Sequence, residues 1–499
     1  MSKITRKCGI LLHPTSLPGS YGTGDLGKHS KTFLDILSNA NIALWQILPL
    51  NPPGYGYSPY QSYSAFAGNP MLIDPENLVN RSWLDENLLI PHEYASSKSN
   101  AKEGAFQKKR AILNSAFERW LKLNGMNSDS FVTFTTKHSH WLKDYAEFCA
   151  LKNHFDNRCW LEWPERFKLR DENALDQFRK EYSKRILYHY FEQYVFELQW
   201  MEIKRSAESK GISIIGDMPI FVALDSADVW ANRQLFILNQ EGQPTVVSGV
   251  PPDYFSETGQ RWGNPLYDWD VLAKTHFLWW IDRFKLMMQH VHYIRVDHFR
   301  GFQAYWEIPV EEETAIKGRW IEAPGKQLFE RVISECGELP IIAEDLGVIT
   351  PEVEELRDSL GFPGMKVLQF GFSGHANNPH LPHNYTENCI VYTGTHDNDT
   401  TVGWFKSSQN DETIRKHLWN YLGYESKEPH WALIRLAFQS IARWAVIPAQ
   451  DVLGLDSQAR MNFPGTSTGN WIWQLDNLEN LKKSLEGIQN LAELYSRTG

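Results

Sequence analysis

Acidic side chains recur in this sequence directly after short apolar runs. They are Asp217, Asp297, Glu344 and Asp397. If these runs are parallel strands of one barrel, their carboxyl ends open on a single cleft. Carboxylates that share a cleft repel one another, so the pKa of at least one should be raised. A protonated acid beside an ionised carboxylate is the pair that cleaves a glycosidic bond.

The stretch Tyr293–Gly301 (YIRVDHFRG) shows how such a strand would deliver charge. Side chains alternate along a strand, so Arg295 and Asp297 share one face and Ile294 and Val296 take the other. An apolar outer face and a charged inner face fit a barrel strand whose C-terminal end meets the active site. Arg295 would keep Asp297 ionised. The alternative is a structural ion pair, because buried pairs also occur without catalysis.

A metal site is the alternative for the acidic cluster, since carboxylates and His also bind cations. The acids lack the spacing of a Ca²⁺ loop, and the adjacent Arg295 disfavours a cation. We therefore expect no metal and no organic cofactor. At the strand end that carries two acids, alternation points Asp345 away from Glu344, so Glu344 is the candidate and Asp345 the competing choice.

Eight short apolar runs could be the strands that position these acids. They are Gly9–His13, Ala43–Leu50, Ile212–Ile220, Tyr293–Phe299, Pro340–Leu346, Met365–Phe372, Cys389–Asp397 and Trp444–Leu453. Near-continuous apolar runs are typical of buried parallel strands. Helical patterns separate most of them: His29–Ala40, Tyr188–Lys210, His276–His290, Lys326–Cys336, Pro351–Leu360 and Trp431–Arg443, with Leu478–Tyr495 closing the chain. The pattern predicts an α/β fold, a (β/α)8 TIM barrel.

Two connections are too long to be simple. Residues from about 75 to 185 carry amphipathic patterns such as Ala105–Leu123 and Trp141–Asn153, which predict a helical insertion. Residues from about 225 to 270 are rich in Gly, Pro and aromatic residues, which predicts a functional loop insertion. The sixth connection, Ser373–Asn388, shows no clear helix. We expect residues 1–499 to form one catalytic barrel domain without a C-terminal β-domain.

Composition limits the class of protein. The 499 residues carry a net charge of −10 with no basic tract, which argues against nucleic acid as a partner. Five scattered Cys without CxxC spacing suggest free thiols in a reducing compartment. The apolar run near the N-terminus is too short for a signal sequence or a membrane span, so we expect a cytoplasmic protein. The 20 Trp and 20 Tyr would suit stacking on sugar faces.

Ordered motifs give the sequence a strong resemblance to the 4-alpha-glucanotransferase (amylomaltase, or disproportionating enzyme) family, glycoside hydrolase family 77 of the alpha-amylase superfamily. The short motif VDH at Val296–His298 would be weak evidence by itself. The matching motifs run nearly end to end. They are GILLHPTSLPGSYGTGDLG at Gly9–Gly27, WQILPL at Trp45–Leu50, GYGYSPYQSYSAFAGNP at Gly54–Pro70, GVPPDYFSETGQRWGNP at Gly249–Pro265, IRVDHFRG at Ile294–Gly301, AEDLG at Ala343–Gly347, GTHDNDT at Gly394–Thr400 and RMNFPGT at Arg460–Thr466.

The resemblance implies roles for individual residues. Asp297 would be the nucleophile, Glu344 the general acid/base, and Asp397 a third carboxylate that steadies the distorted sugar. The burial of Glu344 behind an apolar strand should raise its pKa. Further residues in these motifs and loops are candidates for substrate binding: Arg295, His396, Tyr60, Asp253, Trp262, Asn264 and His298, with Tyr254 and Phe255 as further rings for stacking.

The implied activity is a retaining transfer of α-1,4-glucan segments to the 4-hydroxyl of another glucan or of glucose. Its partners would be α-1,4-glucans, maltooligosaccharides and glucose, with no nucleic acid and no membrane, and the protein would be a monomer or a homodimer. Retention requires the carboxyl groups of Asp297 and Glu344 to lie roughly 5–5.5 Å apart. The alternatives are an α-1,4-glucan hydrolase of the same superfamily and a catalytically silent glucan-binding protein.

Overall fold

The computed structural model describes residues 5–89, 99–252, 256–407, 412–466 and 468–498. Its centre is a parallel eight-stranded sheet in the order β10-β11-β12-β1-β2-β3-β6-β9. The main chain closes the ring, because the Ala343 N–H donates to the Pro363 carbonyl at 2.9 Å. The strands are β1 (Lys7–Leu11), β2 (Leu44–Gln46), β3 (Ser213–Met218), β6 (Tyr293–Val296), β9 (Ile341–Ala343), β10 (Gly364–Val367), β11 (Cys389–Tyr392) and β12 (Trp444–Pro448).

This ring confirms the predicted (β/α)8 barrel, and each of the eight apolar runs overlaps one of its strands. The strands end earlier than the sequence predicts. β9 ends at Ala343, one residue before Glu344, and β11 ends at Tyr392, well before Asp397. Glu344 and Asp397 therefore sit on the loops that leave the strands, where active sites of barrel enzymes are found.

Alternation divides the side chains of β6 between two apolar layers. Ile294 and Val296 are fully buried in the large cluster that joins the barrel to its helices. Tyr293 instead packs against a separate cluster that includes Leu11, Leu44 and other side chains of the barrel strands. This placement confirms the predicted orientation of the strand and leaves Arg295 on the inner face.

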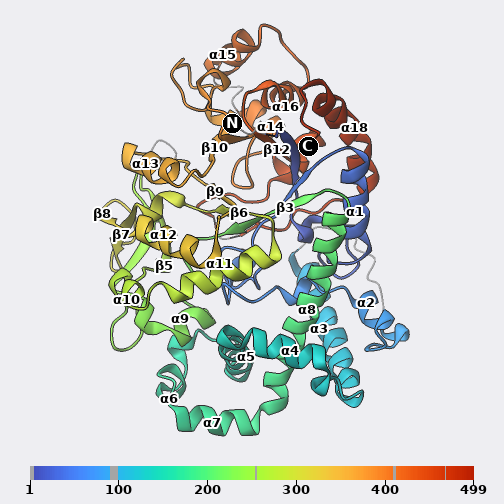
Figure 1. Ribbon diagram of the computed structural model, residues 1–499, viewed down its shortest axis with the longest axis vertical. Coiled ribbons are helices and arrows are strands. Elements are labelled where there is room, and N and C mark those ends of the chain that lie inside the picture. The colour runs from blue at the N-terminus through green and yellow to red at the C-terminus, as the bar shows by residue number, and fades with distance from the viewer. Residues whose placement is uncertain (1–4, 90–98, 253–255, 408–411, 467, 499) are drawn as a thin grey trace.

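Helices surround the barrel, and most of them lie where the sequence predicts (Figure 1). α13 (Pro351–Ser359) begins after Thr350 with Pro351 in its first turn, and Gly361 follows it with a φ of 72°. The remaining helices around the barrel are α1 (Lys28–Asn39), α8 (Ser183–Ser209), α11 (Leu278–His290), α12 (Gly325–Cys336), α14 (Thr401–Ser407), α15 (Glu412–Leu422), α16 (Pro429–Gln439), α17 (Ala449–Val452) and α18 (Leu478–Leu494).

A helical segment follows β2 and lies below the barrel in Figure 1. Its core includes fully buried Trp120, whose ring packs against Phe131 and Phe191. α8 (Ser183–Ser209) then returns the chain to β3, so the segment is attached to the barrel by a long packed helix. Its helices are α2 (Pro75–Asn80), α3 (Ser99–Lys122), α4 (Asp129–Lys137), α5 (Ser139–His154), α6 (Glu165–Lys168) and α7 (Glu172–Glu181).

The prediction of a loop over residues 225 to 270 is wrong. This region contains α9 (Ala227–Ala231), β4 (Val246–Val250), β5 (Gln260–Pro265) and α10 (Trp269–Lys274). β4 and β5 pair with β7 (Ala304–Pro309) and β8 (Arg319–Glu322) in an antiparallel sheet of order β5-β4-β7-β8. β4 pairs with a strand some sixty residues further on, and local patterns do not report such non-local pairing.

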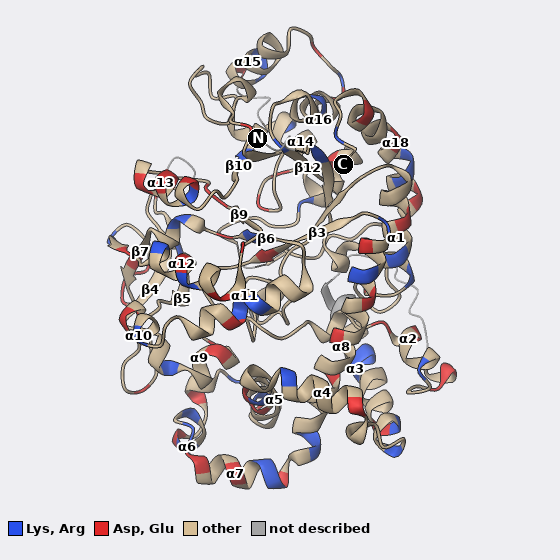
Figure 2. Ribbon diagram, in the orientation of Figure 1, with Lys and Arg blue, Asp and Glu red and all other residues tan. Residues whose placement is uncertain are grey.

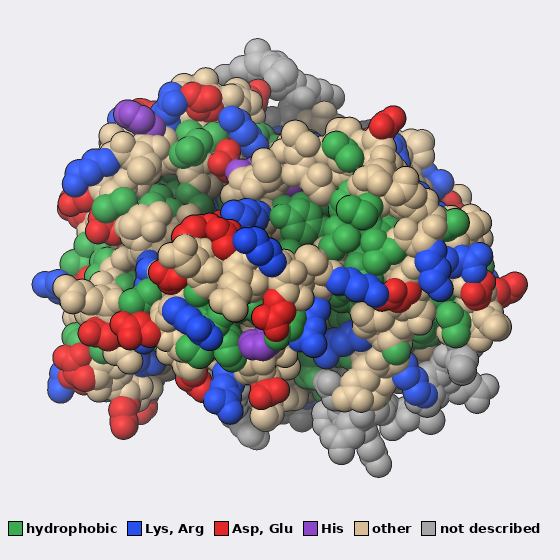
Figure 3. All heavy atoms as spheres, turned by 90° about the horizontal axis from the view of Figure 1, so that it is seen from below, with side chains coloured by type: hydrophobic (Ala, Val, Ile, Leu, Met, Phe, Trp, Pro, Cys, Tyr) green, Lys and Arg blue, Asp and Glu red, His purple; other side chains and the backbone are tan. Residues whose placement is uncertain are grey.

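The outer surface mixes charges of both signs. Lys and Arg alternate with Asp and Glu along the helices (Figure 2), and they are interspersed with apolar patches on the face seen from below (Figure 3). Lys7 in β1, which pairs with β12, also forms an isolated bridge to Thr498. Within the described ranges, none of the helices combines the length and apolar character that a membrane crossing requires.

Candidate active site

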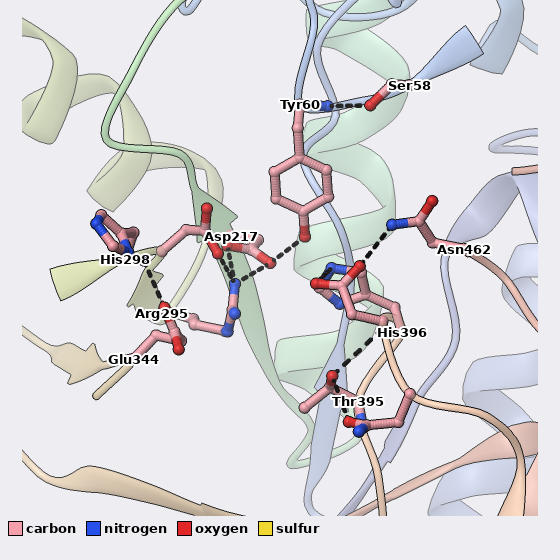
Figure 4. A network of polar contacts seen from close by, with 12 residues as sticks. Ser58, Tyr60, Asp217, Arg295, His298, Glu344, Thr395, His396 and Asn462 are labelled. Atoms are coloured by element: carbon pink, nitrogen blue, oxygen red, sulfur yellow. Dashed lines mark hydrogen bonds and ion pairs between the residues drawn. The ribbon is translucent and has the colours of Figure 1, made fainter. Parts of the chain in front are cut away.

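The predicted acids lie at or just beyond the carboxyl ends of the barrel strands, and Figure 4 shows two of them, Asp217 and Glu344, near Arg295. Asp217 lies near the end of β3, Asp297 directly follows β6, and Glu344 directly follows β9. Asp397 lies on the loop after β11, and the positive charge of Arg295 is one of the influences that lower its pKa. Four elements that are far apart in sequence therefore contribute to one site.

Arg295 joins two of these carboxylates from the inner face of β6. Its Nη1 lies 2.7 Å from Asp217 Oδ2 and 2.9 Å from Asp297 Oδ1, and its side chain is almost completely buried. The Tyr60 hydroxyl donates to the same oxygen, Asp217 Oδ2, at 2.8 Å. Asp217 is thus held by two donors and in turn fixes the guanidinium beside Asp297.

The environment of Asp297 differs in one respect from the expectation. Burial raises the pKa of Asp297 to about 6, although Arg295 lowers it, because Asp217 and Asp397 add repulsion. Arg295 therefore favours the ionised form of Asp297, as predicted, but does not outweigh burial. At neutral pH Asp297 is mostly ionised and unusually basic for a carboxylate.

Glu344 carries the higher pKa of the pair. Burial raises it to about 8, with repulsion from Asp297 acting in the same direction and Arg295 opposing. Two main-chain N–H groups hold the carboxyl group: His298 donates to Oε2 at 2.6 Å and Leu346 to Oε1 at 3.1 Å. Glu344 is thus protonated near pH 7, which is the state that a general acid needs.

Asp397 is held ionised. Burial would raise its pKa, but His396 and a hydrogen bond from Asn462, with Arg295 further away, hold the pKa of Asp397 well below its usual range. Asn462 Nδ2 donates to Oδ1 at 2.7 Å, and His396 Nε2 lies 3.3 Å from Oδ2. Arg460 fixes the backbone by donating to the Asp397 carbonyl at 2.6 Å. The Asp397 side chain is nonetheless 46 % exposed, so it remains accessible from solvent.

Asp345, the competing candidate for Glu344, points away from the site. Its carboxylate forms an ion pair with Arg357 of α13 (Pro351–Ser359) and accepts the Met365 N–H at 2.7 Å. Arg357 lies on a helix outside the barrel, and Met365 belongs to strand β10 (Gly364–Val367). The structure therefore supports Glu344 as the acid that faces the cleft.

The predicted binding residues fall into two groups around the acids. Tyr60 and His396 stack on one side, with ring centroids 5.2 Å apart, and Trp471 packs against both rings. On the other side, Trp262 meets His298 edge-on at 4.8 Å. These two aromatic pairs flank the acids, as walls of a sugar-binding cleft would.

The structure gives less direct support for two other predicted binding residues, Asn264 and Asp253. The Asn264 side chain is buried and already bonded to protein, donating to the Val222 carbonyl at 2.9 Å and accepting from Gln61 at 3.3 Å. It therefore braces β5 (Gln260–Pro265) against the barrel in this structure. Asp253 lies outside the described residues, together with Tyr254 and Phe255.

Sequence reasoning missed two contributors to the site. Asn462 lies in the RMNFPGT motif, and nothing about an Asn at this position distinguishes it from its neighbours as a site residue. Trp471 lies beside Tyr60 and His396 with a φ of 62°, and no local pattern marked it. Among the described residues, no group of three His, Cys, Asp or Glu side chains is arranged to hold a metal ion.

A parallel barrel with an acid of raised pKa beside ionised carboxylates, between aromatic walls, defines an enzyme that acts on glycosidic bonds. The comparisons with known proteins specify the family. The model of glycoside hydrolase family 77, described as 4-alpha-glucanotransferase, matches residues 12–479.

Individual relatives agree with the family match. A 4-alpha-glucanotransferase of Thermus thermophilus is 49 % identical, with 95 % of each chain covered, and one of Synechocystis is 46 % identical, with 99 % of each covered. The solved structure of amylomaltase from Streptococcus agalactiae in complex with acarbose superimposes with a TM-score of 0.92 at 39 % identity, covering 99 % of this chain and all of that one. The chain belongs to glycoside hydrolase family 77 and is an enzyme with 4-alpha-glucanotransferase activity.

Proposed function

We propose that the protein moves α-1,4-glucan segments by double displacement with retention of configuration. In the first step an Asp297 oxygen attacks the anomeric carbon, and the bond from that carbon to the leaving oxygen breaks. Glu344 gives its proton to the leaving oxygen, so the shortened glucan departs as a neutral alcohol. A β-glucosyl ester of Asp297 remains.

In the second step the 4-hydroxyl of another glucan, or of glucose, gives its proton to Glu344 and attacks the same carbon. The ester bond to Asp297 breaks, and both carboxyl groups return to their starting states. Glu344 thus alternates between acid and base, which suits a group whose pKa of about 8 is close to neutrality. No cofactor is required for either step.

The contrast between the two carboxyl groups is the observation that carries this mechanism. Asp297 touches the Arg295 guanidinium at 2.9 Å and has a pKa of about 6, whereas Glu344 is held by main-chain N–H groups and has a pKa of about 8. Carboxyl groups whose environments separate their pKa values take the ionised and the protonated role, respectively. We assign Asp397 to the distorted sugar and Arg295, Tyr60 and His396 to the donor side.

The remaining proposals concern the surroundings of the enzyme. We propose α-1,4-glucans, maltooligosaccharides and glucose as its substrates, and residues 1–499 as one catalytic domain. A cytoplasmic location is supported by the five cysteines, all of which are free thiols. A monomer or homodimer and the lack of nucleic-acid and membrane partners stay predictions.

Incubation with maltotriose, followed by separation of the products, tests the proposal. Transfer yields glucose together with oligosaccharides longer than maltotriose, whereas hydrolysis yields glucose and maltose alone. A preparation that leaves maltotriose unchanged would support a glucan-binding protein instead. NMR of the first-formed product tests the stereochemistry, because retention requires the α-anomer and inversion gives the β-anomer.

A further inference from the structure

His298, the residue after the proposed nucleophile, has an unusual backbone. Its φ of 49° and ψ of 51° lie in the left-handed region. Only Gly adopts this conformation without a steric penalty, although His and Asn adopt it more often than most other residues. Such outliers persist where the surrounding structure imposes them, and they concentrate at functional sites. The conformation of His298 therefore calls for a local cause.

The left-handed turn directs two main-chain N–H groups toward Glu344. The His298 N–H points at Glu344 and donates to Oε2 at 2.6 Å. The next N–H, that of Phe299, donates to the Glu344 carbonyl at 3.0 Å. Two consecutive main-chain donors thus bind the side chain and the backbone of one residue, and Figure 4 shows His298 beside Glu344. The turn links the strand of the nucleophile to the strand of the acid.

Packing holds the turn in place from the other side. The imidazole of His298 meets the Trp262 ring edge-on, with centroids 4.8 Å apart at 88°. The Gly301 N–H donates to the His298 carbonyl at 2.9 Å. A Cβ on Gly301 would come within 3.1 Å of the His298 ring and 2.8 Å of the end of the Ile220 side chain, so a larger residue there would press on both. The side chain therefore anchors the turn, and the backbone makes the contact with Glu344.

We propose that His298 is a positioning residue whose left-handed backbone aims its N–H at Glu344, thereby orienting the acid/base and limiting how strongly that group holds its proton. The proposal rests on the proposed function, because it assigns a role toward Glu344 as acid/base. It differs from the predicted role of the imidazole in binding sugar, since the main-chain N–H carries the effect.

The sign of the effect follows from the hydrogen bond. An N–H that donates to a carboxylate favours the ionised form and lowers the pKa. The charged groups that act on the pKa of Glu344 are Arg295, Asp297 and Asp345, and all three remain when residue 298 changes. Loss of the His298 contact should therefore raise the pKa of Glu344. The alkaline limit of activity should then move to higher pH, while Glu344 becomes a weaker acid.

Substitutions at residue 298 separate the backbone from the imidazole. His298→Gly and His298→Asn lose the imidazole but tolerate the left-handed region, whereas His298→Ala tolerates it less and His298→Val hardly at all. The alkaline limb of the kcat/KM profile should stay in place for Gly and Asn and should rise by about one pH unit for Val, with Ala between them. Thermal melting of each variant shows which of them are folded.

A second readout uses donors with different leaving groups. Cleavage of maltotriose requires a proton from the acid, whereas fluoride leaves α-maltosyl fluoride without one. His298→Val should lower kcat/KM for maltotriose about tenfold more than for the fluoride, because only the cleavage of maltotriose depends on a correctly placed Glu344. A general loss of structure would lower both values alike. Glu344→Gln gives the reference pattern, because it removes the acid altogether.

The outcomes separate this proposal from the function on which it rests. The positioning role predicts that His298→Gly and His298→Asn keep the alkaline limb of the parent protein and its ratio of kcat/KM for maltotriose to kcat/KM for the fluoride. It predicts that His298→Val changes both. Equal changes in all four variants would overturn it and assign the effect to the imidazole. Full maltotriose activity in Glu344→Gln would instead contradict the proposed function. If His298→Val does not fold, the comparison of Ala with Gly decides the matter.

Discussion

Asn462 donates a hydrogen bond to Asp397 across 65 positions of sequence, with 2.7 Å between Nδ2 and Oδ1. The same carboxylate has His396 at its other oxygen, so it is held from both sides. Arg460 reinforces the arrangement by donating to the carbonyls of both Asp397 and Asn462 at 2.6 Å. The segment after the last barrel strand therefore completes a site whose acids come from earlier strands.

Asn462→Ala should lower kcat/KM for maltotriose roughly tenfold, because a hydrogen bond to a charged group contributes about 1.5–3 kcal/mol and its loss frees Asp397 to rotate. Asn462→Asp should lower it further, since a second carboxylate would repel Asp397. Steady-state kinetics check both, with Asn114→Ala on the exposed face of α3 (Ser99–Lys122) as the matched control. Equal activity of Asn462→Ala and Asn114→Ala would contradict the assigned role.

Activity should depend on pH as a bell. Asp297 must be ionised to attack, so kcat/KM should rise as the pH passes about 6. Glu344 must be protonated to assist the leaving group, so kcat/KM should fall as the pH passes about 8. The maximum should lie between these values. A pH profile measured with maltotriose tests this, and a profile that keeps rising above pH 9 would exclude Glu344 as the acid.

The fold and the main acids could be predicted because their signals are local. Each barrel strand is a short apolar run, and Arg295 and Asp297 are placed by alternation along one of them. β4 (Val246–Val250) was missed because one of its two partners, β7 (Ala304–Pro309), lies far along the chain and glycine interrupts its pattern. The identity of Asn462 as a partner of Asp397 depends on tertiary contact alone, which no local pattern contains.

Glu344→Gln should make the protein more stable at alkaline pH. The pKa of Glu344 rises from 4.5 to about 8 on folding, so between these values the folded protein binds more protons than the unfolded chain. The free energy of unfolding therefore falls as the pH rises through this window. Gln stays neutral and avoids this loss, which we expect to reach up to about 5 kcal/mol at pH 9.

Urea denaturation of Glu344→Gln and the parent at pH 5 and pH 9 measures the effect. The two proteins should differ little at pH 5, where Glu344 is protonated in the folded state, and should separate at pH 9. Glu425→Gln, at an exposed position, is the matched control. A difference that is the same at both pH values would mean that burial of the charge is not its cause.

Asp297→Asn should abolish transfer while leaving a folded protein. The amide retains the shape of the side chain but cannot form the ester intermediate, so kcat should fall at least ~10³-fold. Mass spectrometry with α-maltosyl fluoride should detect a glycosylated protein for the parent and none for the variant. Asp476→Asn, at an exposed position, controls for the loss of one charge. Near-normal activity of Asp297→Asn would remove it from the mechanism.

Trp262 is positioned to favour sugar over water as the acceptor. It lies on β5 (Gln260–Pro265), at the end of the segment that follows β4, and its indole N–H donates to Gln260 at 3.2 Å while its ring packs on His298. Transfer requires an acceptor site that binds sugar and excludes solvent, because a glycosyl–enzyme in an open cleft would meet water instead. A ring beside the acids can supply stacking that water cannot replace.

Trp262→Ala should therefore lower transfer more than hydrolysis. A stacking loss of about 1–2 kcal/mol would change the ratio of the two roughly 5- to 30-fold in favour of hydrolysis. New reducing ends and the redistribution of oligosaccharide lengths, followed together in one maltotriose assay, give both rates at once. Trp306→Ala, in β7 of the same antiparallel sheet with its ring on Trp320, controls for loosening of that sheet. If Trp262→Ala slows both reactions in equal proportion, Trp262 contributes general binding and does not select the acceptor.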